Sequence, residues 1–553
     1  MAENNFTNTL YYGDNLAILK SLSVDKDFFL HTNGGIDLIY IDPPFNSNRI
    51  YNMPYEDMLK EVSDQEKYKA QKEAFNDTWS NIDFRQELEE LKGCVDCIQL
   101  YNFLHSNERV FSFPQMSYLT MMAHRIYYMH NVLKDTGSFY LHCDDTIGHY
   151  LKILLDMVFE LKNFRSTIIW QRTSAKKGSQ YARRSYGRYT DNIFFYTKSD
   201  NYFFSTVKVM QDEKELLKKF NKKDENGRNF MIAPIVLIKA MERNNLIYEY
   251  KGYTPKYGWM MNKEKLEQFD KEGRIYWSSN GVPNRKYFLD EYEGKEITNI
   301  WNDIPIARGK ERLGYPTQKP VELLERIIKA SSNEGDIVAD FFCGCGTTIT
   351  AAEKLNRKWL GVDINHLAIS MIEDRRIKPI IDTKENNNKY QIIGFPKDMA
   401  SAEKLAKDDK FKFEQWIVEY VFKGHQTKKT GDKGIDGYIA YNFHNADKKS
   451  IKKMLAIMEV KGGNVNISQI RAFKNSIEND FKADFGLFIA FDKYITDGMR
   501  KEANDLGFVN TDELDVPTLQ FLHLKKMYII TIDDILQDIL PQELQLIVNN
   551  ITY

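Results

Sequence analysis

The stretch DIVADFFCGCGTTITAAEKLNRKWLGVDIN, residues 336–365, decides the fold that this chain is expected to adopt. The apolar run 337–340 predicts a buried strand, a glycine-containing loop follows it, and a helix is predicted from about Thr347. A second apolar run then ends on Asp363. Strand, crossover helix and second strand form a βαβ unit, so this stretch predicts a parallel, Rossmann-like α/β sheet.

The loop between these strands has the composition of a ligand-binding turn. Gly344 and Gly346 permit tight turning and a close approach of the backbone to a ligand. An acidic residue at the tip of the second strand, Asp363, suits the diol of a ribose. The loop lacks the third glycine of the dinucleotide pattern and the Lys-Ser/Thr pair of a P-loop, which disfavours NAD and ATP. A plain structural turn is the alternative, and a nucleoside cofactor is the favoured interpretation.

A second unusual stretch lies near the N-terminus, GIDLIYIDPPFNSNRIYN at residues 35–52. Its apolar run ends on Asp42, and a charge at a strand tip is costly unless it has a task. Pro43 and Pro44 then fix the backbone and remove two hydrogen-bond donors, so the strand cannot continue. Together with the Phe45 ring that follows, they predict a rigid site that presents polar acceptors and one aromatic face.

Four motifs together resemble those of amino-methylating DNA methyltransferases. DFFCGCGTT resembles the S-adenosylmethionine loop of that family, and DPPF resembles its catalytic motif. YPTQKPVELLERII, from Tyr315, resembles the TxKP element that precedes the loop, and YYGDNLAILKSL resembles the family's GDNLE-type segment. Their order between Tyr11 and Ile377, with the catalytic motif first, is similar to the circularly permuted β-class arrangement.

The resemblance implies roles for individual residues. Catalysis would belong to the motif formed by Asp42, Pro43, Pro44 and Phe45. Binding of S-adenosylmethionine would belong to Asp14, Lys319, Asp340, Phe341, Gly344, Gly346, Thr347 and Asp363. The loop residues Phe341, Gly344, Gly346 and Thr347 would surround the methionine part of the cofactor. Asp363 would hold its ribose, and Lys319 would lie near its carboxylate.

The expected chemistry is methyl transfer to an exocyclic amine, which is a poor nucleophile because its lone pair is delocalised into the ring. Asp42 can accept one N–H bond, a carbonyl of the proline pair can accept the other, and Phe45 can stack on a base rotated out of the duplex. Within the family, aspartate at this position favours adenine N6, whereas serine is frequent in N4-cytosine enzymes. The chain departs from the commonest pattern by having Phe45 for tyrosine and Phe341–Phe342 for proline–phenylalanine, and neither change removes a reacting group.

Two regions are expected to contact double-stranded DNA. The loop RTSAKKGSQYARRSYGRY, residues 172–189, contains basic and tyrosine side chains but no acid, which suits phosphate contact, with a solvated loop as the alternative. Its candidate DNA-binding residues are Arg172, Lys176, Lys177, Arg183, Arg184 and Arg188. The region 200–300 is expected to read base edges, and it resembles the recognition region of a large adenine-methylase group that includes type III modification subunits.

A second candidate site lies near the C-terminus, in GDKGIDGYIAYN and MLAIMEVKGG. Glu459 and Lys461 share one face of a predicted strand, and Asp436 stands at the head of another. Asp436 and Glu459 can bind Mg²⁺ while the lysine stabilises a phosphate; an incidental ExK in a solvated hairpin is the alternative. The surrounding pattern resembles Mrr-like PD-(D/E)xK nucleases, which implies a further helical acid, Glu414, with Glu419 as its competitor.

These patterns predict an α/β chain with a Rossmann-like methyltransferase fold, an inserted target-recognition region and a C-terminal nuclease-like α/β domain. The expected boundaries are 1–199 for the catalytic part, 200–300 for target recognition, 301–377 for the cofactor-binding part, 378–412 for a linker and 413–553 for the nuclease-like domain. The favoured function is single-chain restriction and modification of DNA. The alternatives are a methyltransferase with an inactive DNA-binding C-terminal domain, and an RNA methyltransferase or cofactor-binding regulator.

Length, charge and cysteine content indicate a multidomain protein without a disulfide framework. At 553 residues the chain is too long for one core, and its formal net charge of −2 means that DNA binding must come from local basic patches. Five cysteines with a single CxxC, at Cys94 and Cys97, predict neither a disulfide framework nor a four-ligand zinc site. No long apolar run, signal-peptide pattern or P-loop is present, so a cytoplasmic, DNA-associated enzyme without its own ATP-driven motor is expected, with a homodimer as one possible assembly.

Overall fold

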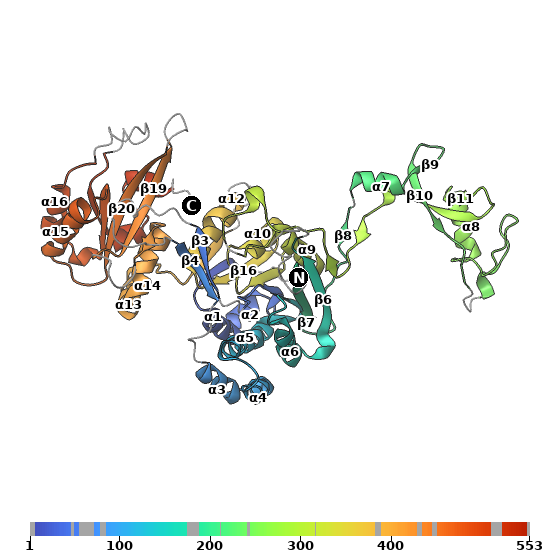
Figure 1. Cartoon of the computed structure of the whole chain (residues 1–553), viewed down its shortest axis with the longest axis horizontal. Helices are drawn as coiled ribbons and strands as arrows, with labels where there is room; N and C mark the ends of the chain where they lie inside the picture. Colours follow the sequence, from blue (N-terminus) through green and yellow to red (C-terminus); the bar gives the residue numbers. More distant parts are fainter. Residues whose placement is uncertain are drawn as a thin grey trace. The chain divides into compact units, whose positions relative to one another are not determined.

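The computed structural model, drawn in Figure 1, describes residues 6–45, 49–54, 71–77, 84–173, 187–210, 212–239, 244–315, 317–381, 389–427, 434–444, 451–509 and 523–549. The chain divides into two compact units, one formed by Met1–Phe204 with Asn299–Tyr553 and the other by Ser205–Thr298. No helix within the described ranges is long and apolar enough to cross a membrane.

The first unit contains a nine-stranded sheet in the order β14-β6-β7-β5-β2-β15-β16-β1-β17. Its strands are β1 (Asn8–Tyr12), β2 (Ile36–Ile41), β5 (Leu133–Cys143), β6 (Phe164–Gln171), β7 (Thr190–Thr197), β14 (Ile300–Trp301), β15 (Ile337–Asp340), β16 (Lys358–Asp363) and β17 (Tyr390–Ile393). The run from β5 through β2, β15, β16 and β1 to β17 is parallel, and β7 pairs antiparallel with both β5 and β6. The predicted βαβ unit is confirmed as β15, α10 (Thr347–Lys354) and β16.

Helices cover this sheet on both sides (Figure 1). They are α1 (Asn15–Val24), α2 (Lys26–His31), α5 (Phe113–Val132), α6 (Gly148–Phe159), α9 (Val321–Ser331), α10, α11 (His366–Met371) and the π-helical η8 (Ile372–Ile377). Two further helices, α3 (Arg85–Gly93) and α4 (Ile98–Ser106), pack on α5 instead. The helices α1, α3, α4, α5 and α6 form one continuous apolar core with β2, β5, β15 and β16. Buried strands in such an α/β sheet are apolar on both faces, which leaves their carboxyl ends as the natural place for polar groups.

The second unit, Ser205–Thr298, has its own small core. A four-stranded sheet in the order β11-β12-β10-β9 contains Ile275–Trp277, Pro283–Phe288, Asn229–Pro234 and Lys222–Lys223. The unit also contains α7 (Glu213–Lys219), α8 (Lys263–Lys271) and a short pair formed by β8 (Lys208–Val209) and β13 (Lys295–Glu296). Trp259, fully buried, packs with Leu266 and Phe269 of α8, so an aromatic-rich core stabilises this small unit.

The C-terminal part of the first unit forms a separate five-stranded sheet, β18-β19-β20-β21-β22. The strands are His425–Gln426, Gly437–His444, Ile451–Lys461, Phe485–Ala490 and Met527–Thr531. Strands β19 and β20 pair antiparallel, whereas β20, β21 and β22 are parallel. The helical segments here are α13 (Met399–Asp408), α14 (Lys410–Gln415), η9 (Trp416–Val421), α15 (Ile467–Asn475), η10 (Ser476–Asp480), α16 (Asp497–Asn504), α17 (Ile532–Leu536) and α18 (Gln542–Asn549).

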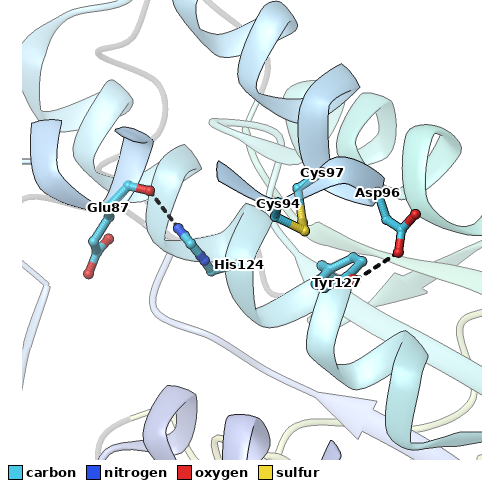
Figure 2. Close-up of a disulfide and its surroundings, with 6 residues drawn as sticks. All are labelled: Glu87, Cys94, Asp96, Cys97, His124 and Tyr127. Atoms are coloured by element: carbon cyan, nitrogen blue, oxygen red, sulfur yellow. Dashed lines mark hydrogen bonds between the residues drawn. A yellow bond between two sulfur atoms is a disulfide. The ribbon is translucent and has the colours of Figure 1, made fainter. Parts of the chain in front are cut away.

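One segment differs from the sequence expectation. The segment 378–412, expected as a linker, contains β17, which adds a parallel edge strand to the large sheet beside β1, and it also contains α13. Its polar composition reflects an edge strand and an exposed helix face. Figure 2 shows Cys94 and Cys97 joined by a disulfide in the turn between α3 and α4, where only local structure is constrained. Next to it the Tyr127 hydroxyl donates to Asp96 over 3.4 Å.

Candidate active site

Four aspartates stand at the carboxyl ends of four adjacent parallel strands of the large sheet. Asp340 and Asp363 are the last residues of β15 and β16, Asp42 follows β2, and Asp14 follows β1 by two residues. Because β2, β15, β16 and β1 are neighbours, the sheet brings these acids to one edge although they come from distant parts of the sequence. This edge is where open α/β sheets bind their ligands.

The most informative of these acids is Asp42, which pairs with Lys319. The Lys319 ammonium donates to Oδ2 of Asp42 and, over 3.3 Å, to the carbonyl of Thr317. The other carboxylate oxygen, Oδ1, is buried and has no hydrogen-bond partner among the described residues. A buried carboxylate oxygen without a donor is costly, so Oδ1 is an acceptor that a ligand's N–H group would satisfy. Lys319 therefore lies at the carboxylate of the DPPF motif.

The Phe45 ring lies beside this pair and is half-buried. The Lys319 ammonium lies 5.4 Å from its ring centroid, and the His142 ring lies on it at 6.1 Å with an interplanar angle of 26°. Pro43 is buried and Pro44 is half-buried, and both lie in non-regular backbone after the end of β2. The motif thus presents one carboxylate oxygen and one aromatic ring at the same strand end.

The glycine loop is shaped by contacts with the TQKP segment. The Tyr315 ring packs so closely on Gly344 that a Cβ there would lie 3.3 Å from it, and the Thr347 hydroxyl donates to the Lys319 carbonyl over 3.2 Å. Gly344 and Gly346 both have positive φ, +49° and +73°, which a residue with a side chain rarely adopts. These two motifs, separate in the sequence, therefore build one cradle.

Replacing Gly346 by alanine is expected to lower the free energy of unfolding by about 2 kcal/mol or more. Its φ is +73°, and a Cβ would lie 2.6 Å from Ile372 of η8. Gly309→Ala is the matched control, because Gly309 also has a positive φ, +58°, but its Cβ would meet nothing within 4 Å. Urea unfolding of both variants measures the difference, and equal losses would contradict the predicted clash.

The two acids that end β15 and β16 organise the loop backbone. Asp340 accepts from the Phe342 amide over 2.9 Å and from the Thr348 hydroxyl over 2.5 Å, and burial raises its pKa to about 7. Asp363 accepts from the amides of Gly344 and Asn365, each over 2.8 Å, and burial raises its pKa to about 6. Each carboxylate thus fixes a turn while its remaining lone pairs are free to accept from a ligand.

Phe341 differs from its expected role around the methionine part of a cofactor. Its ring is fully buried in the large apolar core, so a contact with a cofactor would come from its backbone. Its carbonyl instead accepts from the Asn15 side chain over 2.8 Å. An apolar residue in a loop of small residues gives no sequence signal that separates a core anchor from a ligand contact.

Sequence reasoning missed the residues that hold Asp14. Arg125, from the buried face of α5, donates to Asp14 over 2.9 Å and to Asn15 over 2.6 Å. Asp14 also caps α1, where it accepts from the Ala17 amide over 3.0 Å. A buried arginine inside an apolar helix was a possible signal, since buried charges need partners, but the sequence does not say which partner it meets.

The basic loop is only partly within the described structure. Arg172 lies 3.1 Å from the buried carboxylate of Asp191, and Arg188 donates to the Thr146 hydroxyl over 3.2 Å. Four of the candidate DNA-binding residues, Lys176, Lys177, Arg183 and Arg184, lie outside the described residues. The two described arginines thus flank the loop at the ends of β6 and β7.

The C-terminal sheet brings together the three residues of its candidate site. The Lys461 ammonium lies 2.8 Å from Glu459 and 3.8 Å from Asp436, and Asp436 accepts from the Val460 amide over 2.7 Å. Burial raises the pKa of Glu459, which the lysine opposes. The pKa of Lys461 is also raised, because the nearby carboxylates outweigh the opposing effect of burial. The arrangement is a carboxylate pair bridged by one ammonium group.

The structure separates the two candidate helical acids. Glu414, on α14, lies near enough to this site for the Asp436 charge to add to the effect of burial, and both raise its pKa; Lys410 pairs with it at 3.2 Å. Glu419, on η9, instead pairs with His366 of α11. No group of three His, Cys, Asp or Glu side chains in the described ranges stands at metal-binding spacing.

Curated relatives of the chain are restriction–modification methyltransferases. The type II methyltransferase M.EcaI of Enterobacter cloacae is 32% identical over 276 residues, which cover 49% of this chain and 60% of that protein. The Mod subunit of the type III enzyme StyLTI of Salmonella typhimurium is 26% identical over 377 residues, which cover 65% of this chain and 52% of that protein. The chain thus spans between half and two thirds of the length of these relatives.

Among solved structures, the complex of M1.HpyAVI with SAM aligns with a TM-score of 0.32 at 14% identity, covering 66% of this chain and 98% of that one. The PvuII DNA methyltransferase, described as cytosine-N4-specific, aligns with a TM-score of 0.29 at 15% identity, covering 69% and 94% of the two chains. The family model for DNA methylases of the N6/N4 type matches residues 36–374, a range that contains the DPPF motif, the TQKP segment and the glycine loop. With more than half of its length matched by that model, the chain belongs to the N6/N4 DNA methylase family.

Proposed function

We propose that this chain is an S-adenosylmethionine-dependent methyltransferase of a restriction–modification system, acting on N6 of adenine in double-stranded DNA. The observation that carries the proposal is the buried Oδ1 of Asp42, which has no hydrogen-bond partner among the described residues, together with the Phe45 ring, which Lys319 contacts as it does Asp42. A planar base that carries an amine would satisfy both groups. Its N–H would donate to Oδ1 of Asp42, and its π face would stack on the Phe45 ring. The methyltransferase names of the curated relatives support the same activity.

The residues of the carboxyl edge fit S-adenosylmethionine. The Gly344–Gly346 turn would admit close approach of the ligand, and Asp363 would accept from the ribose hydroxyls with the lone pairs that its backbone amide donors leave free. Asp14, held by Arg125, would stand at the same edge. When bound, the cofactor supplies an electrophilic methyl group on a sulfonium.

Asp42 and its neighbours would make the amine reactive. Oδ1 of Asp42 would accept one N–H of the target amine, which turns lone-pair density out of the ring plane. Lys319 holds the other oxygen, so the carboxylate cannot rotate freely. A carbonyl of the Pro43–Pro44 pair would accept the second N–H, and Phe45 would stack on the extruded base. Asp42 is also the carboxylate placed to receive the proton that the amine loses after transfer.

The test of this proposal is methyl transfer to unmodified plasmid DNA in EDTA, followed by sequencing that locates the modified bases. A single recognition sequence with modified adenine supports it. Transfer to structured RNA in preference to duplex DNA, or no transfer to either, would refute it. The inserted unit Ser205–Thr298 and the loop between Arg172 and Arg188 are proposed to hold the duplex, and the sequence found would define what they read.

Affinity for S-adenosylmethionine is expected to fall as the pH drops through about 6. Burial raises the pKa of Asp363 to about 6, so the carboxylate is ionised above that pH and accepts hydroxyl donors, whereas below it the group is protonated. The loss should approach tenfold per pH unit below the pKa, since only the ionised form binds. Calorimetric titration between pH 5 and 8 measures it.

Asp363→Asn is the control for that pH profile. This variant should bind S-adenosylmethionine weakly, and its affinity should lack the transition near pH 6 because no carboxylate remains to titrate at this position. The comparison also separates Asp363 from Asp340, whose pKa burial raises to about 7. Wild-type affinity that stays constant from pH 7 to pH 5 would contradict the assigned role.

We propose DNA cleavage as a second activity of the C-terminal sheet. The supporting observation is that Lys461 lies between Asp436 and Glu459, with Glu414 nearby. Two carboxylates that leave room for water and phosphate oxygens fit Mg²⁺, which takes few protein ligands at phosphate sites. When bound, the ion supplies an activated water, while the lysine would stabilise charge on the phosphate. The alternative is a C-terminal domain that only binds DNA.

A further inference from the structure

The Phe45 ring rests on a buried polar chain that neither the family motifs nor the proposed chemistry uses. His142, at the end of β5, is fully buried and lies against Phe45 with ring centroids 6.1 Å apart. Its Nδ1 lies 2.8 Å from the Tyr40 hydroxyl and its Nε2 lies 3.1 Å from Asp191 of β7. Three neighbouring strands, β2, β5 and β7, therefore contribute one residue each.

The hydrogen bonds fix how His142 is oriented. A carboxylate only accepts, so Nε2 of His142 carries a proton toward Asp191, and the Tyr40 hydroxyl meets the opposite nitrogen. The Trp170 ring is perpendicular to His142 at 5.6 Å and its indole N–H donates to the Ile304 carbonyl over 2.8 Å. The imidazole is thus held by hydrogen bonds at both nitrogens and by contacts with the Phe45 and Trp170 rings.

The row of polar residues formed by Tyr40, His142 and Asp191 extends to Arg172, at the edge of the basic loop. The other oxygen of Asp191 lies 3.1 Å from Nε of Arg172, the first residue after β6. The Arg172 amide donates to the Tyr189 carbonyl over 2.9 Å, which closes the ends of β6 and β7 below the loop. Burial would raise the pKa of Asp191, but His142, Lys319 and Arg172 together keep it below its usual range. The carboxylate is therefore a buried anion between the loop and the Phe45 support.

A purely structural role does not account well for the buried pair formed by His142 and Asp191. Buried ionic groups rarely stabilise a fold more than apolar residues of the same volume, and a fully buried imidazole with a buried carboxylate carries a large desolvation cost. Most buried side chains of β2 and β5 are apolar, and the buried hydroxyls of Ser138 and Tyr140 on β5 are uncharged. The fully buried imidazole–carboxylate pair lies at the strand ends, against the ring expected to stack on the target base.

We infer that His142 is a positioning residue: held by Asp191 and Arg172, it fixes the Phe45 ring for stacking on the extruded base. This inference rests on the proposed methyltransferase function. It makes base placement depend on Arg172, which stands at the edge of the basic loop and is partly exposed. A DNA phosphate that drew the Arg172 guanidinium would act on the same Asp191–His142 pair.

The test compares His142→Leu, His142→Gln and Asp191→Asn with wild type on a duplex carrying the mapped recognition sequence. His142→Leu and Asp191→Asn are expected to lower kcat about 10- to 100-fold, since small misplacements of reacting groups cost this much. Affinity for S-adenosylmethionine should stay within twofold. The fluorescence rise of 2-aminopurine at the target position, which reports an unstacked base, should shrink in parallel. His142→Gln, whose amide can still donate to Asp191, should recover part of both signals.

Tyr140→Phe is the matched control for loss of a buried hydrogen bond on the same strand. Tyr140 lies two residues before His142 on β5, and its hydroxyl lies 2.7 Å from Ser331 rather than at the site. It should lose stability but keep kcat and the fluorescence signal. A double-mutant cycle with Phe45→Leu adds a second readout, because effects that act through the Phe45 ring are not additive.

The outcomes separate the inference from the function on which it rests. Wild-type protein that methylates DNA while His142→Leu and Asp191→Asn keep kcat and the 2-aminopurine signal within twofold would overturn only the inference. Effects no larger than those of Tyr140→Phe, or effects fully additive with Phe45→Leu, would overturn it as well. Wild-type protein that methylates no DNA would instead refute the proposed function, and the inference with it.

Discussion

Asp42→Asn is expected to reduce methyl transfer to DNA by at least about 100-fold, the usual cost of losing one preorganised group at a reacting centre. The substitution keeps the shape of the side chain but replaces an anionic acceptor by an amide. The buried Oδ1 that lacks a partner among the described residues would no longer be a carboxylate oxygen, and the Lys319 ammonium would lose its counter-charge. Initial rates with tritiated S-adenosylmethionine measure the loss.

The control for that variant is Asp303→Asn. Asp303 forms a comparable carboxylate–cation pair with Arg326, at 2.9 and 2.6 Å, and it is not part of the site described above. Its transfer rate should stay within about twofold of wild type because the pair lies outside the site, although the variant loses stability since the buried Arg326 guanidinium loses its counter-charge. Binding of S-adenosylmethionine by Asp42→Asn should also persist. Asp42→Asn protein that methylates DNA at the wild-type rate would refute the catalytic assignment.

Lys461→Ala is expected to lower Mg²⁺-dependent cleavage of unmodified plasmid by about 100-fold or more, while methyl transfer stays unchanged. The reason is that the Lys461 ammonium lies between Asp436 and Glu459, and charge clamps on a phosphoryl group contribute this much. Gel analysis of plasmid with Mg²⁺ measures cleavage, and the same protein in EDTA reports methylation. A plasmid premethylated by the protein should resist cutting.

Lys493→Ala is the matched control in the same domain. Lys493 pairs with Glu403 at 2.7 Å on an exposed surface, so the substitution removes the same charge without touching the candidate site. It should cut like wild type. Cleavage by Lys461→Ala at the wild-type rate would refute the assigned role, and wild-type protein that never cuts DNA would leave the C-terminal sheet as a binding module.

Much of the large sheet could be predicted from the sequence because its decisive residues end apolar runs. Asp340 and Asp363 are the last residues of β15 and β16, as the pattern in residues 336–365 indicates. The apolar composition of such strands and the glycine or proline residues that end them are local features of the sequence. They can therefore be recognised without knowing the tertiary structure. The same reasoning fixed the position of Asp42 after β2.

The pairing of those residues could not be predicted, because it depends on contacts between distant segments. Nothing local says that Lys319 meets Asp42, or that Arg125 holds Asp14. The His142–Asp191 pair is likewise set by which strands are neighbours in the sheet. The strand β17 within the polar segment 378–412 could not be predicted, because an edge strand buries little surface and so carries no strong apolar pattern.

The most direct test of the account is the identity of the base that the protein modifies. Unmodified plasmid is incubated with the wild-type chain and S-adenosylmethionine in EDTA, digested to nucleosides, and analysed by mass spectrometry. The account predicts N6-methyldeoxyadenosine, which appears with wild type and is lost with Asp42→Asn. N4-methyldeoxycytidine in its place would contradict the adenine assignment, and the absence of any methylated nucleoside would contradict the methyltransferase itself.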